Sequence, residues 1–553
     1  MDKAVSDLWW KNAVVYCLDV ETYVDASGDG VGDFRGLTRR LQYIAGLGVT
    51  CIWLMPFYPS PNRDDGYDVS DYYNVDPRYG TLGDFVEFVR TANDRGIRVI
   101  IDLVVNHTSV EHPWFQESRD PQSDRHGWYV WSDQPLDRPE QVIFPEAEDS
   151  NWERDERSGK YYLHRFYTEE PDLNVANPQV RDEIHRIIGF WMQMGVSGFR
   201  VDAVPYLIGE AGIWDEMPDQ PHSVLREMRK FMGRRRGDAV MIGEVNLDYG
   251  ERTKFFGHYG EEMTGLFNFM LAGAVFNALA TEDARSLAGH LRDTPPSPEE
   301  CQWMNFLRNH DELNVGHLPR EERETVLSAL ATERTRIFGR GIRRRVPPLV
   351  GGDPRQIRLL YSVMLALPGT PVLLYGEEIG MGDDLSLQGR MAVRTPMQWS
   401  SGANAGFSTA AAPDLVRPVV TDGQFGYEEV NVAKQRRDPD SLLNWMERAL
   451  RTRKECPEFG WGRWEVLGTD VPAVLAHRCD WLDSTVIAVH NFSGEPANVR
   501  LDVGEGNKGD QVMDVFGDRE YDPLNPGDPR LQIAGYGYRW MRPQGPGGSG
   551  PAS

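Results

Sequence analysis

The chain alternates short apolar runs with longer amphipathic segments, and this alternation limits the folds that it can adopt. The runs are nearly continuous in apolar residues, which is typical of strands buried on both faces of a parallel sheet. The segments between them carry apolar residues at helical spacing, as Leu41, Ile44 and Leu47 do before Gly48. Repeated strand–helix units predict an α/β fold, and eight strands suit a closed (β/α)8 TIM barrel. The eight runs occupy residues 13–17, 51–56, 98–107, 198–204, 239–246, 265–269, 302–310 and 370–378.

Two regions depart from this alternation. The first, residues 108–172, is rich in Trp, Tyr, Asp, Arg and Pro. Because a structureless loop of that length is improbable in a compact protein, we expect a small inserted domain there. The second, residues 456–543, has short runs of alternating polarity, which indicate a C-terminal β-sandwich. Residues 1–107 and 173–455 then form the barrel, and a disordered tail is expected at 544–553.

The composition excludes several kinds of partner and places the protein in a reducing compartment. The chain has 84 acidic and 59 basic residues and a net charge of −25, which repels the phosphates of nucleic acids. Its five scattered cysteines, without a C-x-x-C pair, indicate neither a disulfide framework nor a zinc site. The sequence suggests no membrane span and no signal peptide, so we expect a cytoplasmic protein without a membrane partner. No pattern indicates the oligomeric state.

Polar residues stand at the C-terminal ends of several predicted strands. In a (β/α)8 barrel these C-terminal strand ends form the active site. Carboxyl groups that lie near one another raise one another's pKa. A retaining glycosidase needs such an arrangement, because it uses one ionised carboxylate as nucleophile and one carboxyl group that is held protonated. A loop cap or salt bridge is the alternative for any single acid, but four strand ends carry such residues. They are Asp102, Asn106 and His107 on the third strand, Arg200 and Asp202 on the fourth, Glu244 on the fifth, and His310 and Asp311 on the seventh.

These residues lie in strings that match a known family. The strings DLVVNH, GFRVDAV, GEVN and FLRNHDE resemble, in this order, the four motifs of the α-amylase superfamily, glycoside hydrolase family 13, and EPDLN resembles its additional motif. The similarity extends from about Trp9 to Pro543 and covers nearly the whole chain. The strings begin at residues 102, 198, 243, 306 and 170, respectively.

The resemblance implies a role for each strand-end residue. Asp202 would be the nucleophile, Glu244 the general acid/base and Asp311 the transition-state stabiliser. The remaining implied contacts are Arg200, which would keep Asp202 ionised, and His107 and His310, which would hold hydroxyl groups of the glucosyl ring. An anionic Asp311 also makes physical sense, because the oxocarbenium-like transition state is cationic.

Two further strings are similar to those of the exo-acting α-glucosidase branch. They are GYD at residues 66–68 and VRTPMQW at residues 393–399. The resemblance implies that Asp68 and Arg394 pair across the non-reducing end of glucose and that Tyr67 stacks on the sugar. We therefore expect a closed pocket that admits one terminal glucose and excludes long chains.

The string DASGDGVGD at residues 25–33 suggests a metal ion. It places oxygen atoms at alternating positions with glycines between them, as a tight hard-cation loop requires, although an Asp/Gly-rich turn without metal is the alternative. It resembles the calcium loop of the glucosidase branch, and the ligands so implied are Asp25, Ser27, Asp29, the Val31 carbonyl and Asp33, with Ser27 where the family usually has Asn. A second site, similar to that of trehalose synthases, would use Asn106, Asp172 and Glu210.

The reaction outcome remains open between hydrolysis and isomerisation. The strings HPWFQESR, YVWSD and GIRRRVPPL resemble trehalose synthases, which isomerise maltose to trehalose. Two strings differ from that subfamily: IGEVNLDYG (242–250) replaces an AEANQWP-like run, and YCLDVETY (16–23) replaces a YEVxVRxF-like run. We therefore predict a retaining α-glucosidase-type enzyme acting on terminal bonds of small neutral α-glucosides, with transfer to another acceptor left open. The alternatives are trehalose synthase, a phosphorylase, and a non-catalytic barrel scaffold.

Overall fold

The eight predicted strands form one closed, all-parallel barrel, which confirms the expected fold class. Each predicted apolar run contains one strand of the ring. The strands follow one another around the barrel in chain order, and the last pairs with the first. The structure is a computed structural model that describes residues 8–135, 142–208, 222–501, 511–522 and 530–544.

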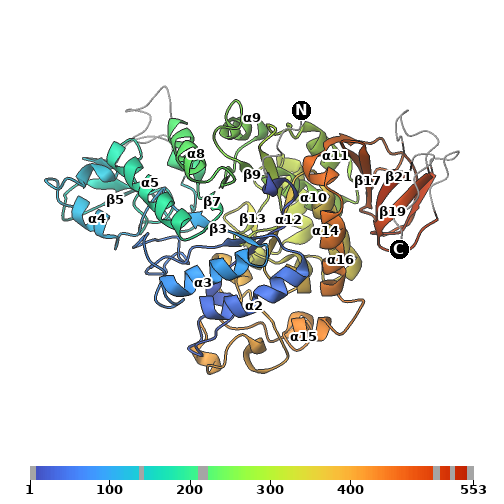
Figure 1. Ribbon diagram of the computed structural model, residues 1–553, viewed down its shortest axis with the longest axis horizontal. Helices are drawn as coiled ribbons and strands as arrows, with labels where there is room; N and C mark the ends of the chain where they lie inside the picture. The colour runs from blue at the N-terminus through green and yellow to red at the C-terminus, as the bar shows by residue number, and fades with distance from the viewer. Residues whose placement is uncertain (1–7, 136–141, 209–221, 502–510, 523–529, 545–553) are drawn as a thin grey trace.

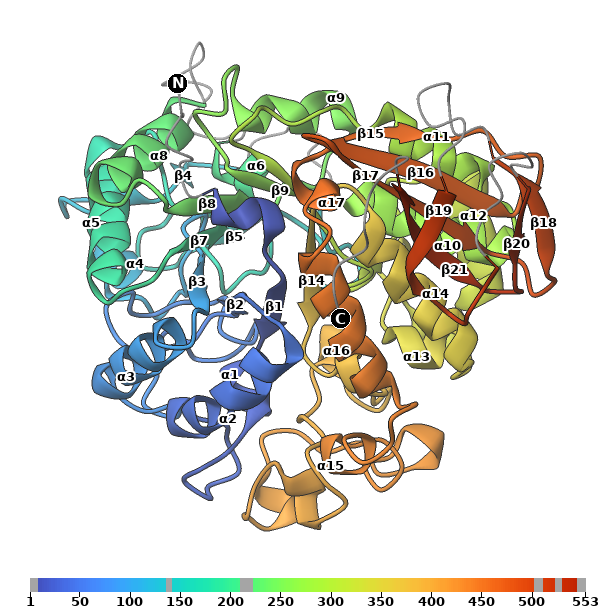
Figure 2. The ribbon, with the colours of Figure 1, turned by 45° about the vertical axis from the view of Figure 1, so that its right-hand side comes forward.

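The barrel strands are almost entirely buried. Helices cover the outside of the ring, as Figures 1 and 2 show. The apolar character of the runs follows from this burial on both faces. The strands are β1 (Val15–Leu18), β2 (Cys51–Leu54), β3 (Arg98–Leu103), β7 (Gly198–Val201), β8 (Val240–Gly243), β9 (Gly265–Phe267), β10 (Gln302–Asn305) and β14 (Thr370–Leu374).

The surrounding helices begin and end at local signals. Thr81 and Asp84 form a capping box at the start of α3, and Asn177 caps α5, whose first residue is proline. Gly48 ends α2 in the left-handed conformation, with φ of 99°. The main helices are α2 (Phe34–Leu47), α3 (Leu82–Asn93), α5 (Pro178–Gln193), α8 (Ser223–Arg235), α10 (Phe269–Thr281), α14 (Pro354–Ala366) and α16 (Leu442–Lys454).

Strand β3 is shorter than predicted. The apolar run extends to His107, but the strand ends at Leu103. The Tyr72 hydroxyl contacts the carbonyl oxygens of Val104 and His107 at 2.8 and 2.9 Å, and His107 forms an isolated bridge with Asp172. The chain therefore leaves the ring at Leu103 and enters the following segment.

That segment contains a three-stranded antiparallel sheet in the order β4-β6-β5. The strands are β4 (Trp131–Ser132), β5 (Trp152–Arg154) and β6 (Tyr161–Leu163), and the helix α4 (Pro113–Ser118) precedes them. Aromatic side chains hold it together, as where Phe115 stacks on Trp131 with ring centroids 5.6 Å apart.

A second small sheet follows β10 and has no counterpart in the sequence prediction. Its order is β11-β13-β12 and every pairing is antiparallel. The helix α12 (Arg320–Leu330) lies between β11 and β12 in the chain. The strands are β11 (Leu313–Asn314), β12 (Arg336–Ile337) and β13 (Gly341–Ile342). Strands of two residues are too short to leave a periodic pattern.

The C-terminal part is antiparallel β structure that packs on the barrel helices at the red end of the ribbon (Figure 1). A sheet in the order β15-β16-β17-β21-β19 lies next to a two-stranded sheet, β18-β20. Trp540 donates a hydrogen bond to Ser362 of α14. The predicted tail lies outside the described residues, apart from Gln544. The strands are β15 (Arg463–Val466), β16 (Val474–Trp481), β17 (Ser484–Asn491), β18 (Ala497–Arg500), β19 (Gln511–Gly517), β20 (Arg530–Ile533) and β21 (Tyr538–Gln544).

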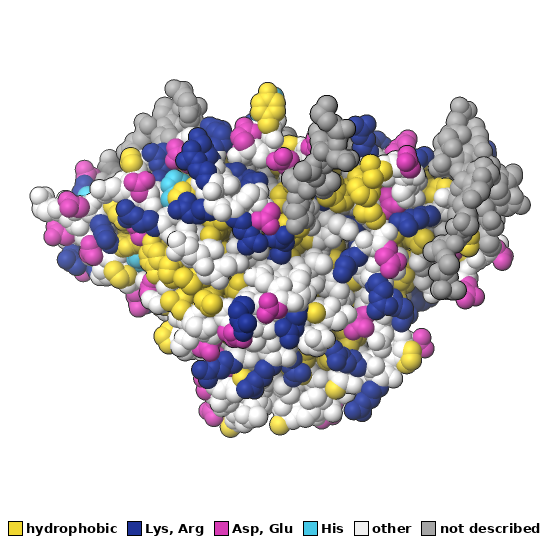
Figure 3. All heavy atoms as spheres, in the orientation of Figure 1, with side chains coloured by type: hydrophobic (Ala, Val, Ile, Leu, Met, Phe, Trp, Pro, Cys, Tyr) yellow, Lys and Arg dark blue, Asp and Glu magenta, His cyan; other side chains and the backbone are white. Residues whose placement is uncertain are grey.

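The face shown in Figure 3 is mixed in charge and also carries some hydrophobic side chains. Acidic and basic side chains are interspersed on the face shown in Figure 3. Among the described residues, no helix has the length and apolar character needed to cross a lipid bilayer.

Candidate active site

One buried arginine joins three acids at the end of the barrel strands. Arg200 of β7 donates hydrogen bonds to Asp102 at 2.6 Å, to Asp202 at 2.5 Å and to Glu244 at 2.7 Å. Asp102 lies in β3, Asp202 follows β7 and Glu244 follows β8, and these three strands are neighbours in the ring. The parallel barrel thus brings together side chains that are 142 residues apart (102 to 244) in the sequence. Asp202 and Glu244 lie side by side on one guanidinium.

The two carboxyl groups differ in their acidity. Burial raises the pKa of Asp202 to about 6, although Arg200 opposes the shift. Burial raises the pKa of Glu244 to about 7; Arg200 opposes this shift, and the negative charges of Asp202 and Asp311 add to it. Between these values Asp202 is ionised and Glu244 is protonated. This is the charge arrangement that a nucleophile and a general acid need.

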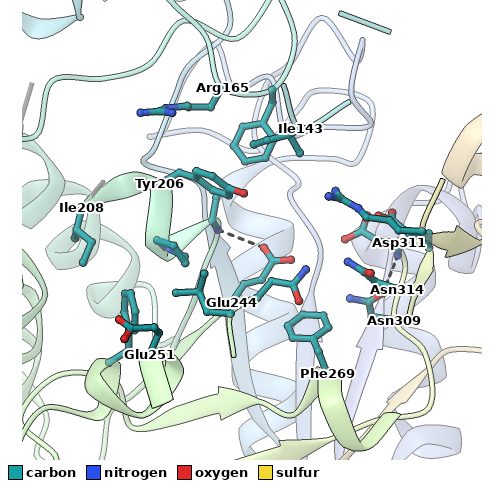
Figure 4. A pocket seen from close by; sticks show the side chains of 18 of the residues that line it. Ile143, Arg165, Tyr206, Ile208, Glu244, Glu251, Phe269, Asn309, Asp311 and Asn314 are labelled. Atoms are coloured by element: carbon teal, nitrogen blue, oxygen red, sulfur yellow. Dashed lines mark hydrogen bonds between the residues drawn. The ribbon is translucent and has the colours of Figure 1, made fainter. Parts of the chain in front are cut away.

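Ala203 holds an uncommon backbone conformation between the two acids. Its φ of 48° is left-handed, which costs energy for a residue with a side chain. The turn directs the Ala203 N–H toward Glu244, and this N–H donates a hydrogen bond of 3.3 Å to a carboxyl oxygen of Glu244 (Figure 4). The strain therefore positions Glu244 relative to Asp202.

Asp311 approaches the same cavity from the side opposite Glu244 (Figure 4). It accepts a hydrogen bond from Arg394 at 2.8 Å and lies 3.2 Å from Arg390. Burial alone would raise the pKa of Asp311, but the positive charges of Arg390, Arg394 and Arg200 together lower it well below its ordinary value. Asp311 is thus a permanent negative charge facing the cavity.

Tyr67 and His310 form the next contact of the site. The Tyr67 hydroxyl oxygen lies 2.7 Å from His310 Nε2, and the two rings stack with centroids 5.8 Å apart. Burial lowers the pKa of His310 well below its ordinary value, so the ring is neutral. Its Nδ1 is buried without a hydrogen-bond partner among the described residues. The predicted residues Tyr67 and His310 therefore come together beside Asp311.

His107 and Glu170 carry unsatisfied polar atoms. In the described part of the chain, His107 Nε2 and both carboxyl oxygens of Glu170 are buried without a hydrogen-bond partner, and they lie 3.8 Å apart at their nearest. Burial lowers the pKa of His107 to about 4 and raises that of Glu170 well above its ordinary value. Sequence analysis assigned no role to Glu170. Its signal was the glutamate at the start of EPDLN, where the resembling motif has glutamine.

Asp68 and Arg394, which are predicted to pair across the glucose, do not contact each other in the described structure. Asp68 accepts hydrogen bonds from the Ser60 hydroxyl and from the N–H groups of residues 63 and 64, so its turn holds it in place. Arg394 donates instead to Asp65 at 2.6 Å, besides its contact with Asp311. Asp65 has φ of 53°, a left-handed conformation that turns its side chain toward Arg394. Arg394 therefore pairs with Asp65, three residues before Asp68 in the chain.

The cavity above these residues measures about 640 Å³. Glu244 and Asp311 line it, together with Tyr206 and Asn314, as Figure 4 shows. Tyr206 belongs to α6 (Val204–Leu207), which follows Asp202 directly. A disaccharide fits a cavity of this size.

An aromatic contact closes one wall of the cavity. Phe144 of the segment after β3 packs against Phe338 of the sheet after β10, with ring centroids 4.6 Å apart. The guanidinium of Arg390 lies 5.0 Å from the Phe144 ring. Phe338 has φ of 54°, which is a genuine outlier for a bulky residue. We call Phe144, Phe338 and Arg390 the aromatic clasp.

The predicted metal residues lie as follows. Asp25 accepts hydrogen bonds from the Ser27 hydroxyl at 3.0 Å and from the N–H groups of residues 28 and 30, and Asp33 accepts from Ser27 N–H at 2.9 Å. Asp29 accepts from the Val31 N–H at 3.0 Å. Both Asp25 and Asp33 thus face the interior of the loop. At the second site, Asn106 donates to Asp172 at 3.3 Å, and Glu210 lies outside the described residues.

Comparison with family models finds two matches. The model described as alpha amylase, catalytic domain, matches residues 20–462, and that of the sucrose hydrolase-like C-terminal domain matches residues 484–542. Among solved structures, the crystal structure of an α-amylase from H. orenii has a TM-score of 0.78 at 28% identity, covering 97% of this chain and 100% of that one.

Comparison with curated proteins finds both isomerases and hydrolases. The chain is 42% identical to the trehalose synthase of Thermus thermophilus over 534 residues, which are 96% of this chain but 55% of that protein. It is 40% identical to the trehalose synthase of Pimelobacter sp. strain R48, covering 97% of this chain and 96% of that protein. It is 30% identical to the oligo-1,6-glucosidase of Parageobacillus thermoglucosidasius, covering 89% of this chain and 92% of that protein.

Proposed function

This chain belongs to the α-amylase family, glycoside hydrolase family 13, and from that premise we propose that it cleaves terminal α-glucosidic bonds by double displacement. The substrates are disaccharides and short gluco-oligosaccharides, which are small and neutral. The observation that carries the proposal is the pairing of Asp202 and Glu244 on the single guanidinium of Arg200. Retaining glycosidases need two carboxyl groups about 5 Å apart, and side-by-side contacts with one arginine support such a spacing.

In the first step Asp202 attacks the anomeric carbon while Glu244 protonates the departing oxygen. The ionised state of Asp202 is favoured by Arg200, and the protonated state of Glu244 by burial. Asp311 faces the sugar with a fixed negative charge, which stabilises the positive charge of the oxocarbenium-like transition state. The products of this step are a covalent glucosyl ester on Asp202 and a free leaving sugar.

In the second step Glu244, now ionised, removes a proton from water, and the water oxygen attacks the same carbon. The ester bond to Asp202 breaks, Glu244 recovers its proton, and glucose leaves with its original anomeric configuration. If a sugar hydroxyl replaces water, the product is a new glucoside. Hydrolysis and transfer thus share one intermediate.

We attribute the specificity for a terminal glucose to an ion pair next to Asp311. Asp65 and Arg394 form a buried ion pair next to Asp311 of the cavity, and we expect a chain that continued beyond the non-reducing end of the glucose to meet this pair. Tyr67, His310 and His107 supply a ring face and polar atoms for the glucose itself. The arrangement supports exo-action.

Incubation with maltose, trehalose, sucrose and isomaltose tests the proposal. We expect glucose to be released with retained configuration, as followed by proton NMR of the fresh product. An inverted anomer, or equal release by wild type and an Asp202→Asn variant, would contradict double displacement at this site. The second result would also favour the alternative of a non-catalytic barrel.

Trehalose synthesis is the second candidate function. Two observations favour it: the 40–42% identity with trehalose synthases, and the aromatic clasp, which closes the cavity where a cleaved sugar would stay. Isomerisation needs the released glucose to remain and rotate while water is kept out. Trehalose formed from maltose without a matching amount of glucose would establish this function in place of hydrolysis.

Activity is expected to show a narrow bell-shaped pH profile with its optimum between about 6 and 7. Asp202 must be ionised, so kcat/KM falls as the pH drops below its pKa of about 6. Glu244 must be protonated, so kcat/KM falls as the pH rises above its pKa of about 7. Because the two groups share Arg200, the apparent pKa values describe the pair. Measurement of kcat/KM across about pH 4 to 9 tests this, and a profile without an alkaline limb contradicts it.

We further propose that the loop at residues 25–33 binds calcium. The donor set of carboxylate, hydroxyl and carbonyl oxygens suits a hard cation, and Asp25 and Asp33 both face the loop interior. An ion there would compete with the backbone N–H groups that now donate hydrogen bonds to these carboxylates. Asp25, Ser27, Asp29, Val31 and Asp33 would hold the ion, which would stabilise the loop.

Removal of calcium is expected to lower the melting temperature by about 3 °C or more, because an ion bound to the folded state alone stabilises that state. Metal analysis after dialysis and differential scanning calorimetry with and without EDTA measure this. An Asp29→Asn variant should show a smaller response to EDTA. Absence of bound calcium together with an unchanged melting temperature contradicts the proposal.

We also propose a cytoplasmic location. All five cysteines lie in the described part of the chain, where they are free and buried; they are Cys17, Cys51, Cys301, Cys456 and Cys479. Unpaired thiols suit a reducing compartment.

A further inference from the structure

Three carboxylates meet next to Arg394, which also contacts the cavity residue Asp311. Asp19, Glu21 and Asp65 have ligand atoms that all lie within 4.8 Å of one another. Asp19 follows β1 and Glu21 lies in α1 (Val20–Tyr23), within the string YCLDVETY that departs from the trehalose synthase pattern. Asp65 comes from the loop after β2. Such a cluster is costly in a protein interior unless positive charges compensate it.

Arg417 supplies the central compensation. It donates hydrogen bonds to Glu21 at 2.6 Å, to Asp19 at 3.3 Å and to Asp65. It also donates to the backbone carbonyl of Arg394 at 3.0 Å. Arg417 is 7% exposed and lies between η8 (Ala412–Asp414) and η9 (Gly423–Phe425). One side chain therefore contacts all three acids and the backbone of the residue that pairs with Asp65.

The other charges around the cluster do not replace Arg417. Arg394 contacts Asp65 alone of the three acids, and Arg78 contacts Glu21 at 2.9 Å from a partly exposed position. Burial raises the pKa of Asp19 above its ordinary value and that of Glu21 to about 7, whereas Arg417 and Arg394 hold that of Asp65 below its ordinary value despite burial. Without Arg417, Asp65 would face two acids that lack their shared cation.

We infer that Arg417 is a positioning residue for substrate recognition: it holds Asp65 against Arg394, and this pair closes the pocket beyond the non-reducing end of the glucose. The contacts run from Arg417 to Asp65, to Arg394 and on to Asp311. Arg417 itself touches neither substrate nor reacting atoms. The inference rests on the proposed function and deepens it, because it names what fixes the exo-specific end of the pocket.

The geometry requires arginine. A planar guanidinium presents several N–H groups in fixed directions, so it can contact three carboxylates at once. Lysine would keep the positive charge but offers a single nitrogen, and methionine would keep much of the volume without the charge. A comparison of arginine, lysine and methionine at position 417 therefore separates the effects of charge, hydrogen-bond geometry and side-chain volume.

Arg417→Met and Arg417→Lys variants test the inference, with Arg453→Met as the matched control. Arg453 is as deeply buried, but its partners are Asn12 and the backbone carbonyls of residues 369 and 456. Each variant is assayed with p-nitrophenyl α-glucoside and its 4-deoxy analogue, which lacks the hydroxyl at the non-reducing end. Binding of 1-deoxynojirimycin, a glucose-shaped inhibitor, is measured by calorimetry as a readout independent of turnover.

We expect Arg417→Met to raise KM about tenfold with a smaller change in kcat, because binding is lost equally in ground state and transition state. Its preference for the glucoside over the 4-deoxy analogue should fall at least about fivefold, and Arg417→Lys should lie between it and wild type. Arg453→Met should keep the wild-type preference even if its stability falls.

Wild-type preference in a folded Arg417→Met variant overturns the inference, and so does an equal loss in Arg453→Met, which would indicate a general structural effect. If wild type does not turn over α-glucosides, the proposed function fails, and inhibitor binding still decides the role of Arg417. Weaker binding in Arg417→Met alone supports the positioning role, and unchanged binding overturns it.

Discussion

Replacement of Asp202 by glycine is expected to lower kcat/KM for α-glucosides by about 10⁴-fold or more, and azide should restore part of the activity with the opposite stereochemistry. The variant lacks the carboxylate that forms the covalent ester, and losses of this size follow removal of a catalytic nucleophile. Azide can occupy the space that the side chain leaves beside Arg200 and attack the same face of the sugar. The product is then β-glucosyl azide, because only one displacement takes place.

Release of p-nitrophenol and NMR of the sugar product measure both effects. Asp102→Asn is the matched control, because Asp102 shares Arg200 with Asp202 at nearly the same distance but lies deeper in the barrel. Its loss should be smaller and should not respond to azide. A rescued product with α configuration, or near wild-type activity in Asp202→Gly, excludes Asp202 as the nucleophile.

Replacement of Glu244 by glutamine is expected to lower kcat/KM for maltose by about 10² to 10⁴-fold, the range typical of a lost general acid. For 2,4-dinitrophenyl α-glucoside the loss in kcat/KM should be below about tenfold, because this leaving group departs without a proton. The alkaline limb of the pH profile should disappear at the same time, since Glu244 is the group that titrates there.

Steady-state rates with the two substrates, together with pH profiles, measure this difference. Glu251→Gln is a suitable control, because Glu251 also lines the cavity but forms an exposed ion pair with Lys254. It should affect both substrates alike and only slightly. An equal loss for maltose and the dinitrophenyl substrate in Glu244→Gln would remove Glu244 from the role of proton donor.

The barrel could be predicted from the sequence because its strands are buried on both faces. Eight runs without polar alternation suit few folds besides a closed parallel barrel, and the structure contains one strand in each run. The same logic predicted that the proposed catalytic acids come together, since Asp202 and Glu244 directly follow strands whose ends meet. Local patterns and a simple topological rule sufficed for both.

The residues that sequence analysis missed depend on backbone turns and distant contacts. Asp64, Asp65 and Asp68 lie close together in the chain, and the left-handed turn at Asp65 decides which of them meets Arg394. Arg417 contacts Asp65 from 352 positions further along the chain, and no periodicity records such a contact. Glu170 was visible only as an unusual residue in a motif, and its burial without partners among the described residues required the structure.

The aromatic clasp also has a consequence for the speed of the enzyme. Phe144, which lines the cavity, and Phe338 belong to two separate excursions from the barrel, and their rings are in contact. We expect a freed sugar to leave only after these rings separate, whichever bond was broken before. Maximal throughput is then governed by the opening rate of the protein, so aryl glucosides with very different phenols should converge on one kcat.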